Sequence, residues 1–115
     1  MGVANVQVRT NFFYMIARLV CEAQEQGIRV ICTSFIRTTA EQRDLFERGK
    51  SRCDGTKKVS KHQLGTAADL ALVKNERLIW DDAPEYGILG EIWEDLGGIW
   101  GGRWKTFRDI FHFEV

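Results

Sequence analysis

A segment near the start of the chain carries apolar side chains at the spacing of an α-helix. Between residues 10 and 26 they recur every three or four positions, at Phe12, Ile16, Leu19, Val20 and Ala23. Charged residues take the other faces, and Gly27 follows as a helix end. The pattern predicts an amphipathic helix over residues 10–26 that packs its apolar stripe on a protein core.

Four other segments have strand patterns. Residues 28–35 are rich in β-branched and apolar side chains, which predicts a buried strand. Residues 67–73 and 77–80 predict a hairpin across the turn at 74–76. The aromatic and polar alternation at residues 111–115 predicts a last strand.

Two more helices are expected. Thr38, followed three positions later by Glu41, forms a capping box that opens a short helix ending at Gly49. Residues 86–96 form a second amphipathic pattern. The polar and basic segment at 50–58 is expected to be a solvated loop, with a flexible rim of the functional site as the alternative.

Helices and strands alternate without βαβ regularity, which favours an α+β fold with a mainly antiparallel central sheet flanked by helices. The length of 115 residues, with one proline and no linker-like stretch, predicts a single domain over residues 1–115. Sixteen basic residues balance sixteen acidic ones, so charge gives no reason to expect a nucleic-acid or membrane partner.

No stretch is apolar enough to span a membrane, and residues 1–10 lack the pattern of a signal peptide. We therefore expect a protein made in the cytoplasm without a signal peptide. The odd number and irregular spacing of Cys21, Cys32 and Cys53 favour reduced thiols over disulfides.

The candidate chemistry lies around the only two histidines, His62 and His112. Asp69 opens an apolar strand, where a carboxylate is costly unless a metal or a cation compensates it. Two imidazoles and a carboxylate are a plausible three-residue ligand set for Zn²⁺, which leaves a fourth position open for water. The alternative is that each histidine is an ordinary hydrogen-bonded residue of the core or surface.

Several motifs in this chain resemble those of one known family, the zinc peptidases of the D-Ala-D-Ala carboxypeptidase and L-alanyl-D-glutamate endopeptidase group (peptidase family M15), which includes many phage endolysins. Its pattern Ser-x-His-x-x-Gly-x-Ala-x-Asp is matched by Ser60, His62, Gly65, Ala67 and Asp69. Its closing Asp-x-x-His-Phe-Glu is matched by Asp109, His112, Phe113 and Glu114. The segments 34–38 with 41–42, and 100–104, are similar to further family motifs, although Phe35 stands where a glycine is common.

This resemblance implies a hedgehog/DD-peptidase-like fold, in which His62, Asp69 and His112 bind Zn²⁺. It implies that Asp109 is the general base for a zinc-activated water and that Arg37 holds a substrate carboxylate or the developing oxyanion. Four residues are expected to touch substrate or support the ligands: Ser60, Gln42, Trp104 and Glu114.

Several roles have alternatives. Glu114 is a rival base, Ser60 could be a simple cap, and Cys53 is disfavoured as a metal ligand. Gly65 and Ala67 are expected to let the backbone pass close to the metal, with an ordinary turn as the alternative. In segment 100–104 the tryptophan rings are expected to wall a groove, and the glycines to let an extended peptide approach the zinc.

Within the family, segment 100–104 and Asp109 favour an endopeptidase that cuts the L-Ala-D-Glu bond of peptidoglycan stem peptides. The leaving side then carries D-Glu, whose free α-carboxylate suits an arginine. The alternatives are a D-Ala-D-Ala carboxypeptidase or dipeptidase and a non-catalytic zinc-stabilised binding module. The expected protein is a monomer that acts on the cell wall after release through a phage-type membrane pore.

Overall fold

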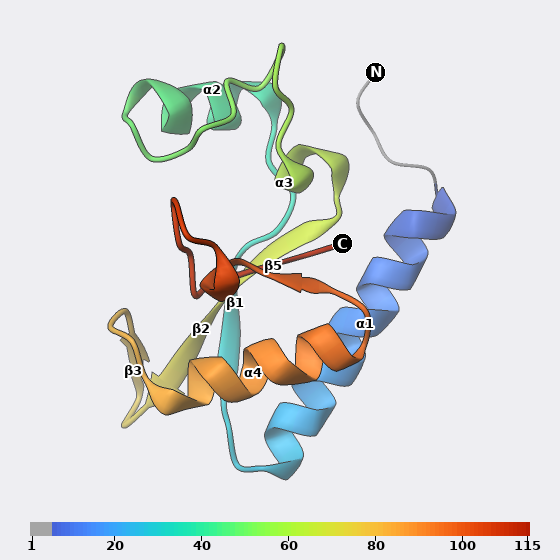
Figure 1. Ribbon diagram of the computed structural model, residues 1–115, viewed down its shortest axis with the longest axis vertical. Coiled ribbons are helices and arrows are strands. Elements are labelled where there is room, and N and C mark those ends of the chain that lie inside the picture. Colours follow the sequence, from blue (N-terminus) through green and yellow to red (C-terminus); the bar gives the residue numbers. More distant parts are fainter. Residues whose placement is uncertain (1–5) are drawn as a thin grey trace.

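The central strand of the sheet is β2 (Ala67–Lys74), which lies between all its neighbours (Figure 1). On one edge it pairs with β1 (Val30–Ser34). On the other edge it pairs with β5 (His112–Glu114) at one end and with β3 (Arg77–Ile79) at the other. A short strand, β4 (Ile99–Trp100), pairs with β5, and every pairing is antiparallel.

This arrangement comes from a computed structural model that describes residues 6–115. Residues 1–5, part of the segment judged to lack a signal pattern, lie outside the described residues. None of the helices described is both long and apolar enough to cross a membrane.

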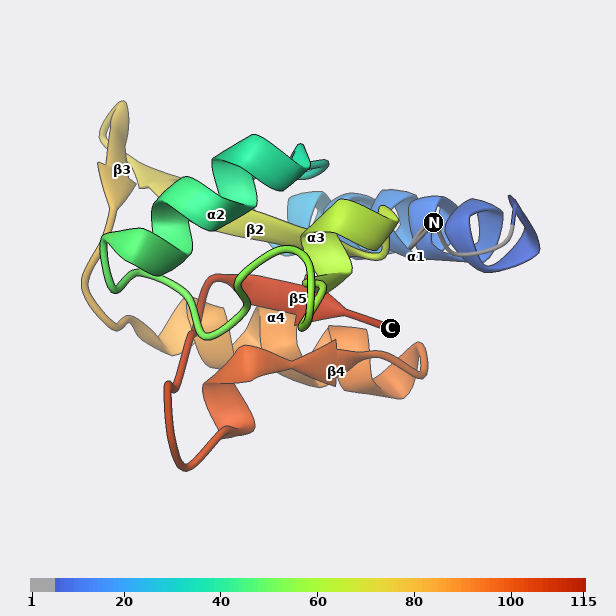
Figure 2. The same cartoon turned by 90° about the horizontal axis from the view of Figure 1, so that it is seen from above.

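Helices lie in two groups around the sheet. The long helices α1 (Val6–Glu25) and α4 (Pro84–Asp95) contact each other, whereas α2 (Thr39–Glu47) and the single-turn α3 (Lys61–Leu64) lie together at the end of the molecule away from α4 (Figures 1 and 2). A 3-10 turn, η1 (Gly101–Arg103), directly follows β4. The α2–α3 end carries one wall of the site described below.

Aromatic rings fasten the two long helices to the sheet. The ring of Trp93 on α4 meets Phe12 of α1 edge-on, with centroids 5.6 Å apart, and meets Phe113 of β5 in the same way at 6.0 Å. All three side chains are fully buried. Such edge-to-face pairs add a directional preference to the burial of a large apolar area, so they fix how α1, α4 and β5 sit against one another.

The buried indole N–H groups also hold β5 in place. Trp93 donates to the carbonyl of Glu114 at 3.0 Å, and Trp100 donates to the carbonyl of Ile110 at 2.9 Å. Because a buried N–H without a partner is costly, these bonds restrain the backbone on both sides of His112. The core therefore positions one of the candidate ligands directly.

The predicted elements are present with shifted ends, and the α+β class with an antiparallel sheet is confirmed. The capping box of Thr38 and Glu41 is formed as predicted, and the three cysteines are unpaired. The prediction of a buried first strand is wrong, because β1 is an edge strand whose three middle residues, Ile31, Cys32 and Thr33, are exposed. A short segment rich in β-branched and apolar residues cannot by itself distinguish an edge strand from a central one.

Candidate metal centre

Asp69 and His112 face each other across the β2–β5 pair. They are partners in its antiparallel register. Directly opposed residues on one face of such a pair have Cβ atoms about 5 Å apart, so the two side chains meet. His112 Nδ1 lies 3.3 Å from Asp69 Oδ1.

His62 reaches the same point from α3. Ser60 caps this turn by accepting from the backbone N–H of Gln63, and the Ser60 N–H in turn donates to Gln63 Oε1. Gly65 ends the turn at φ +76°, a left-handed conformation that favours glycine. These two local signals aim His62, which is 2% exposed, at the sheet.

The three side chains bring one ligand atom each to a common point. The candidate atoms of His62, Asp69 and His112 all lie within 4.8 Å of one another. His62 Nε2 lies 3.3 Å from Asp69 Oδ1, the oxygen that also faces His112. Two imidazole nitrogens and a carboxylate oxygen are the types of donor that catalytic zinc sites use, and a group arranged in this way could hold a metal ion.

The outward-facing atoms of the same side chains are all held by other groups. His62 Nδ1 lies 2.8 Å from the carbonyl of Phe35, and His112 Nε2 lies 2.8 Å from Glu114 Oε1. Asp69 Oδ2 accepts from Arg37 Nη2 at 3.2 Å. Partners of this kind fix the ring orientation and tautomer of metal-binding histidines.

One buried atom tests whether a metal fits. His62 Nε2 is fully buried and has no hydrogen-bond partner among the described residues. An unpaired buried nitrogen is costly, and the bond from Nδ1 to the Phe35 carbonyl leaves Nε2 with its lone pair directed inward. The donor set therefore fits Zn²⁺.

The protonation states of Asp69 and His112 depend on each other and on their neighbours. Burial raises the pKa of Asp69, but its interactions with the imidazoles of His112 and His62 outweigh burial and hold that pKa well below its usual range. Burial likewise lowers the pKa of His112, whereas its bonds to Asp69 and Glu114 raise it to about 9. Without a metal, His112 is therefore protonated at neutral pH, and a bound cation would take the place of that proton.

A pocket of about 290 Å³ opens beside these residues. His62, His112 and Asp109 line it. Burial, followed by the nearby charge of Asp69, raises the pKa of Asp109, which is the direction of shift that favours a general base. Among the described residues, Asp109 is the carboxylate beside the metal group that is bound neither to a histidine nor to an arginine.

Gly101 lets the Asp109 segment come this close. A Cβ on Gly101 would lie 2.4 Å from the Asp109 carbonyl oxygen, and the Asp109 N–H donates to the Gly101 carbonyl at 3.0 Å. The expectation that the glycines and tryptophans of segment 100–104 serve the substrate is thus wrong in part. Trp100 is buried in the core, and only Trp104 reaches the pocket, where its ring lies 5.1 Å from that of His112.

Arg37 is bound into the protein on three sides. Its Nη2 donates to Asp69, its Nη1 to Gln42 Oε1 at 3.1 Å, and its Nε to Ser34 Oγ at 3.2 Å. Gln42 is fully buried and donates onward to Ser51 Oγ and the Cys53 carbonyl. The network joins a candidate ligand to the pocket wall, so the guanidinium is directed at Asp69 as well as at the pocket that it lines.

The remaining predicted site residues lie close to the centre. Glu114 contacts His112 and lines the pocket, and Ser60 both caps α3 and lines the pocket. Cys53 also lines the pocket but does not join the metal group. For Gly65 the ordinary turn proposed as the alternative is what the structure contains, since a Cβ there would meet Arg9 at 2.8 Å rather than the metal ligands.

Comparison with known proteins places the chain in a family. Residues 54–115 match the family model Peptidase M15, described as D-alanyl-D-alanine carboxypeptidase. The chain belongs to peptidase family M15. The resemblance read from the motifs, including membership in this metallopeptidase family, is thereby confirmed.

One M15 relative is the peptidoglycan L-alanyl-D-glutamate endopeptidase CwlK of Bacillus subtilis. It is 32% identical over 111 residues, which cover 84% of this chain and 66% of that protein. This chain thus spans slightly less than two thirds of the relative it matches.

Two solved structures share the fold. The L-Ala D-Glu endopeptidase ChiX of Serratia marcescens superposes with a TM-score of 0.73 and 22% identity, covering 99% of this chain and 80% of that one. A mutant of the vancomycin resistance D,D-pentapeptidase VanY, in complex with Zn(II), gives a TM-score of 0.67 and 18% identity over 90% of this chain and 70% of that one. At these identities the likeness confirms the DD-peptidase-like fold and no more.

Sequence reasoning missed two parts of the site. The turn α3 was not predicted, although Ser60 followed three positions later by Gln63 is a capping-box signal. The loop at 50–58 was expected to be merely solvated, but residues 50–53 line the pocket, as the alternative of a rim proposed. No local pattern reveals which loop will face a distant histidine.

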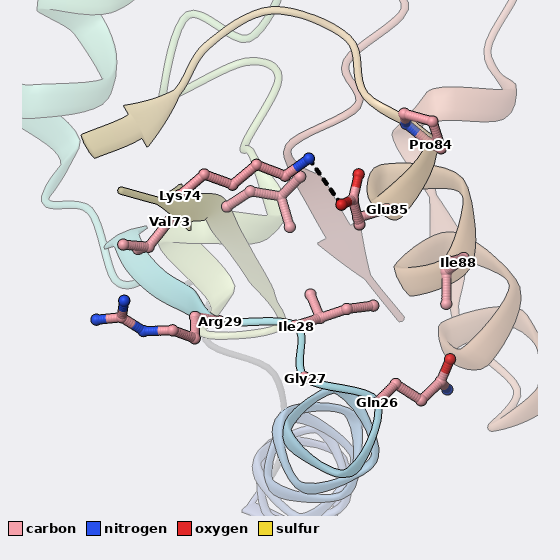
Figure 3. Close-up of a pocket in the computed structure, with 10 residues that line it drawn as sticks. Gln26, Gly27, Ile28, Arg29, Val73, Lys74, Pro84, Glu85 and Ile88 are labelled. Carbon is pink, nitrogen blue, oxygen red and sulfur yellow. Dashed lines mark ion pairs between the residues drawn. The ribbon is translucent and has the colours of Figure 1, made fainter. Parts of the chain in front are cut away.

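A second hollow, of about 500 Å³, has no comparable chemistry (Figure 3). It lies where the end of α1 meets the far end of β2 and the start of α4. Its polar feature is the ion pair of Lys74 Nζ with Glu85 Oε2 at 2.7 Å. It contains none of the predicted site residues.

Proposed function

We propose that this protein is a zinc-dependent peptidoglycan endopeptidase that hydrolyses the L-Ala-D-Glu bond of cell-wall stem peptides. The observation that carries the proposal is the convergence of His62, Asp69 and His112 on one point, within 4.8 Å of one another, beside a pocket that Asp109 also lines. A binding module would have no need of a half-buried carboxylate with a raised pKa at that place.

His62 and His112 would each bind the ion through an imidazole nitrogen, and Asp69 through a carboxylate oxygen. A zinc ion held there would polarise the scissile carbonyl and activate a water molecule. Asp109 would take the proton from the attacking water and pass it to the leaving amine. The Glu114 carboxylate is bound to His112 Nε2 at 2.8 Å, which suits it to orient a ligand rather than to act as the base.

The choice of bond rests on the relatives. CwlK, the 32% identical relative, is named as an L-alanyl-D-glutamate endopeptidase, which supports the same cleavage here. The family description, D-alanyl-D-alanine carboxypeptidase, supports the second candidate, removal of terminal D-Ala. In either case we propose that residues 1–115 act as one catalytic domain, as a monomer, on cell-wall peptides reached through a phage-type pore.

Mass spectrometry of digested sacculi distinguishes these functions. Purified sacculi incubated with zinc-loaded protein should release peptides with a new N-terminal D-Glu, and the His62→Ala protein should release none. Release of free D-Ala with intact L-Ala-D-Glu bonds would identify a carboxypeptidase. No release by a fully zinc-loaded sample would favour the binding module.

A further inference from the structure

Arg52 crosses from one wall of the pocket to the other. It belongs to the loop after α2, whereas its contacts are in the loop after η1. Its Cζ lies 4.8 Å from the centroid of the Phe107 ring, and its Nη1 donates to Thr106 Oγ1 at 3.4 Å. Both Arg52 and Phe107 line the pocket that His62 and His112 share. A guanidinium stacked on an aromatic face in this way is held in place with most of its N–H donors still available.

Arg52 has no acidic partner among the described residues, which is also true of Arg9, Arg18, Arg43 and Arg77, but none of those four lines this pocket. Within the described residues, five arginines lie within 4.0 Å of a carboxylate: Arg29, Arg37, Arg48, Arg103 and Arg108. Over the same residues 6–115 no carboxylate pairs with Arg52. A positioned cation without a counter-charge, at the rim of a pocket, is suited to bind an anionic group of a ligand.

Arg37, the residue first expected to bind a substrate carboxylate, is committed elsewhere. Its Nη2, Nη1 and Nε each donate to a protein oxygen, and Asp69 already neutralises its charge. Two of its five N–H donors remain free, but a substrate carboxylate would meet a guanidinium whose charge Asp69 already offsets. Arg52 would bind the same group without breaking an ion pair.

The backbone at Phe107 supports a functional role for this contact. Phe107 has φ +53°, a left-handed conformation that is uncommon for a non-glycine residue, and its large side chain is 60% exposed. Neither feature is explained by packing in the core. Residues in such sparsely populated conformations cluster at active sites, ligand clamps and switch regions, and Phe107 lines the pocket.

We propose that Arg52, held by the ring of Phe107, binds the free carboxylate on the residue that follows the scissile bond, and so selects acidic substrates. The inference rests on the proposed function, because D-Glu after the cut bond carries such an α-carboxylate. Arg52 contacts the substrate in this proposal, whereas Phe107 is a positioning residue that acts through it.

Paired peptides that differ at one group test the proposal. The substrates are L-Ala-γ-D-Glu-L-Lys with its α-carboxylate free and the same peptide with that group as a carboxamide. Wild type should have a higher kcat/KM on the acid than on the amide. Arg52→Ala should lower kcat/KM on the acid about tenfold, mainly by raising KM, and should change kcat/KM on the amide little. Arg77→Ala removes the same charge from β3, outside the pocket, and should leave both values unchanged.

Variants of Phe107 test whether its ring holds the Arg52 guanidinium in place. Phe107→Leu should reduce the preference for the acid, and Phe107→Tyr, which keeps an aromatic face, should restore it. If Phe107 had a purely structural role, its replacement would lower kcat/KM on both substrates by the same factor. Zinc content and thermal unfolding of each variant, measured alongside, confirm that the centre is intact.

Binding gives a readout that does not need turnover. Calorimetric titration with γ-D-Glu-L-Lys should give a Kd about tenfold weaker for Arg52→Ala than for wild type, and its carboxamide counterpart should show no such difference. Equal losses on acid and amide, or no loss on either, would overturn the role of Arg52. If wild type cuts neither substrate, the proposed function fails, and the titration alone then decides for or against Arg52.

Discussion

Arg37 Nη2 lies 3.2 Å from Asp69 Oδ2, and the other oxygen of the same carboxylate faces both histidines. Both side chains are only 17% exposed. The ion pair therefore decides which carboxylate oxygen is presented to a metal. Arg37 is tied to the metal centre through Asp69, in addition to any contact that it makes with substrate.

Arg37→Ala should accordingly weaken zinc binding. Removing a group that orients a ligand lowers metal affinity by about 10- to 100-fold. Arg37→Lys should recover only part of this loss, because one ammonium cannot reach Asp69 and Gln42 with the same fork. Competition with a chelator measures the affinity, and the control is Arg48→Ala, which removes an exposed ion-paired arginine at the C-cap of α2. An unchanged zinc affinity would mean that Arg37 serves substrate alone.

The three proposed ligands should each be required for the metal. The purified protein is expected to carry about one zinc per chain, and His62→Ala, Asp69→Ala and His112→Ala should each lose it. Elemental analysis gives the stoichiometry. Glu76→Ala removes an exposed carboxylate on the hairpin and should retain full zinc. Full retention by the three ligand variants would contradict the assignment.

Much of this centre could be predicted from sequence because its residues lie in short motifs with recognisable order. His62 and Asp69 belong to one short motif, because only residues 65 and 66 separate α3 from β2. The Asp69–His112 register could not be read, since it depends on how β5 joins the sheet. For the same reason β1 was taken for a buried strand.

The roles of arginines and glycines were harder to predict than the ligands. An arginine next to a motif suggests substrate binding, but the bond of Arg37 to Asp69 joins residues 32 positions apart. Gly101 looked like an opening for substrate, whereas it leaves room for the backbone at Asp109. Long-range packing determines such roles, and residue identity alone does not.

Alanine variants of Asp109 and Glu114 should differ in whether they lose catalysis or zinc affinity. Asp109→Ala should keep the metal and lose catalysis by about 10² or more, because it removes a positioned general base. Glu114→Ala should retain more activity at saturating zinc but bind zinc more weakly, because His112 Nε2 loses its 2.8 Å partner. Kinetics with zinc titration measures both. An inactive Glu114→Ala protein beside an active Asp109→Ala protein would reverse the assignment of the base.

The last prediction concerns the stability of the metal-free protein in alkaline solution. The folded state raises the pKa of His112 from 6.5 to about 9 through Asp69 and Glu114. A raised pKa means that the folded state binds the proton more tightly than the unfolded state. This stabilisation is therefore complete below about pH 6.5 and is lost as the pH rises through about 9.

The free energy of unfolding of the metal-free protein should therefore fall by at most about 3 kcal/mol between pH 6.5 and pH 9. Asp69, whose pKa lies below its usual range, stays ionised throughout this interval and adds no slope. Urea unfolding in the presence of a chelator measures the change. His112→Ala should remove this contribution. Zinc-loaded protein should not show the decline either, because the metal requires the unprotonated nitrogen and is bound more tightly as the competing proton is lost. A metal-free wild type whose stability is the same at pH 6.5 and pH 9 would show that His112 is not held as a protonated partner of Asp69.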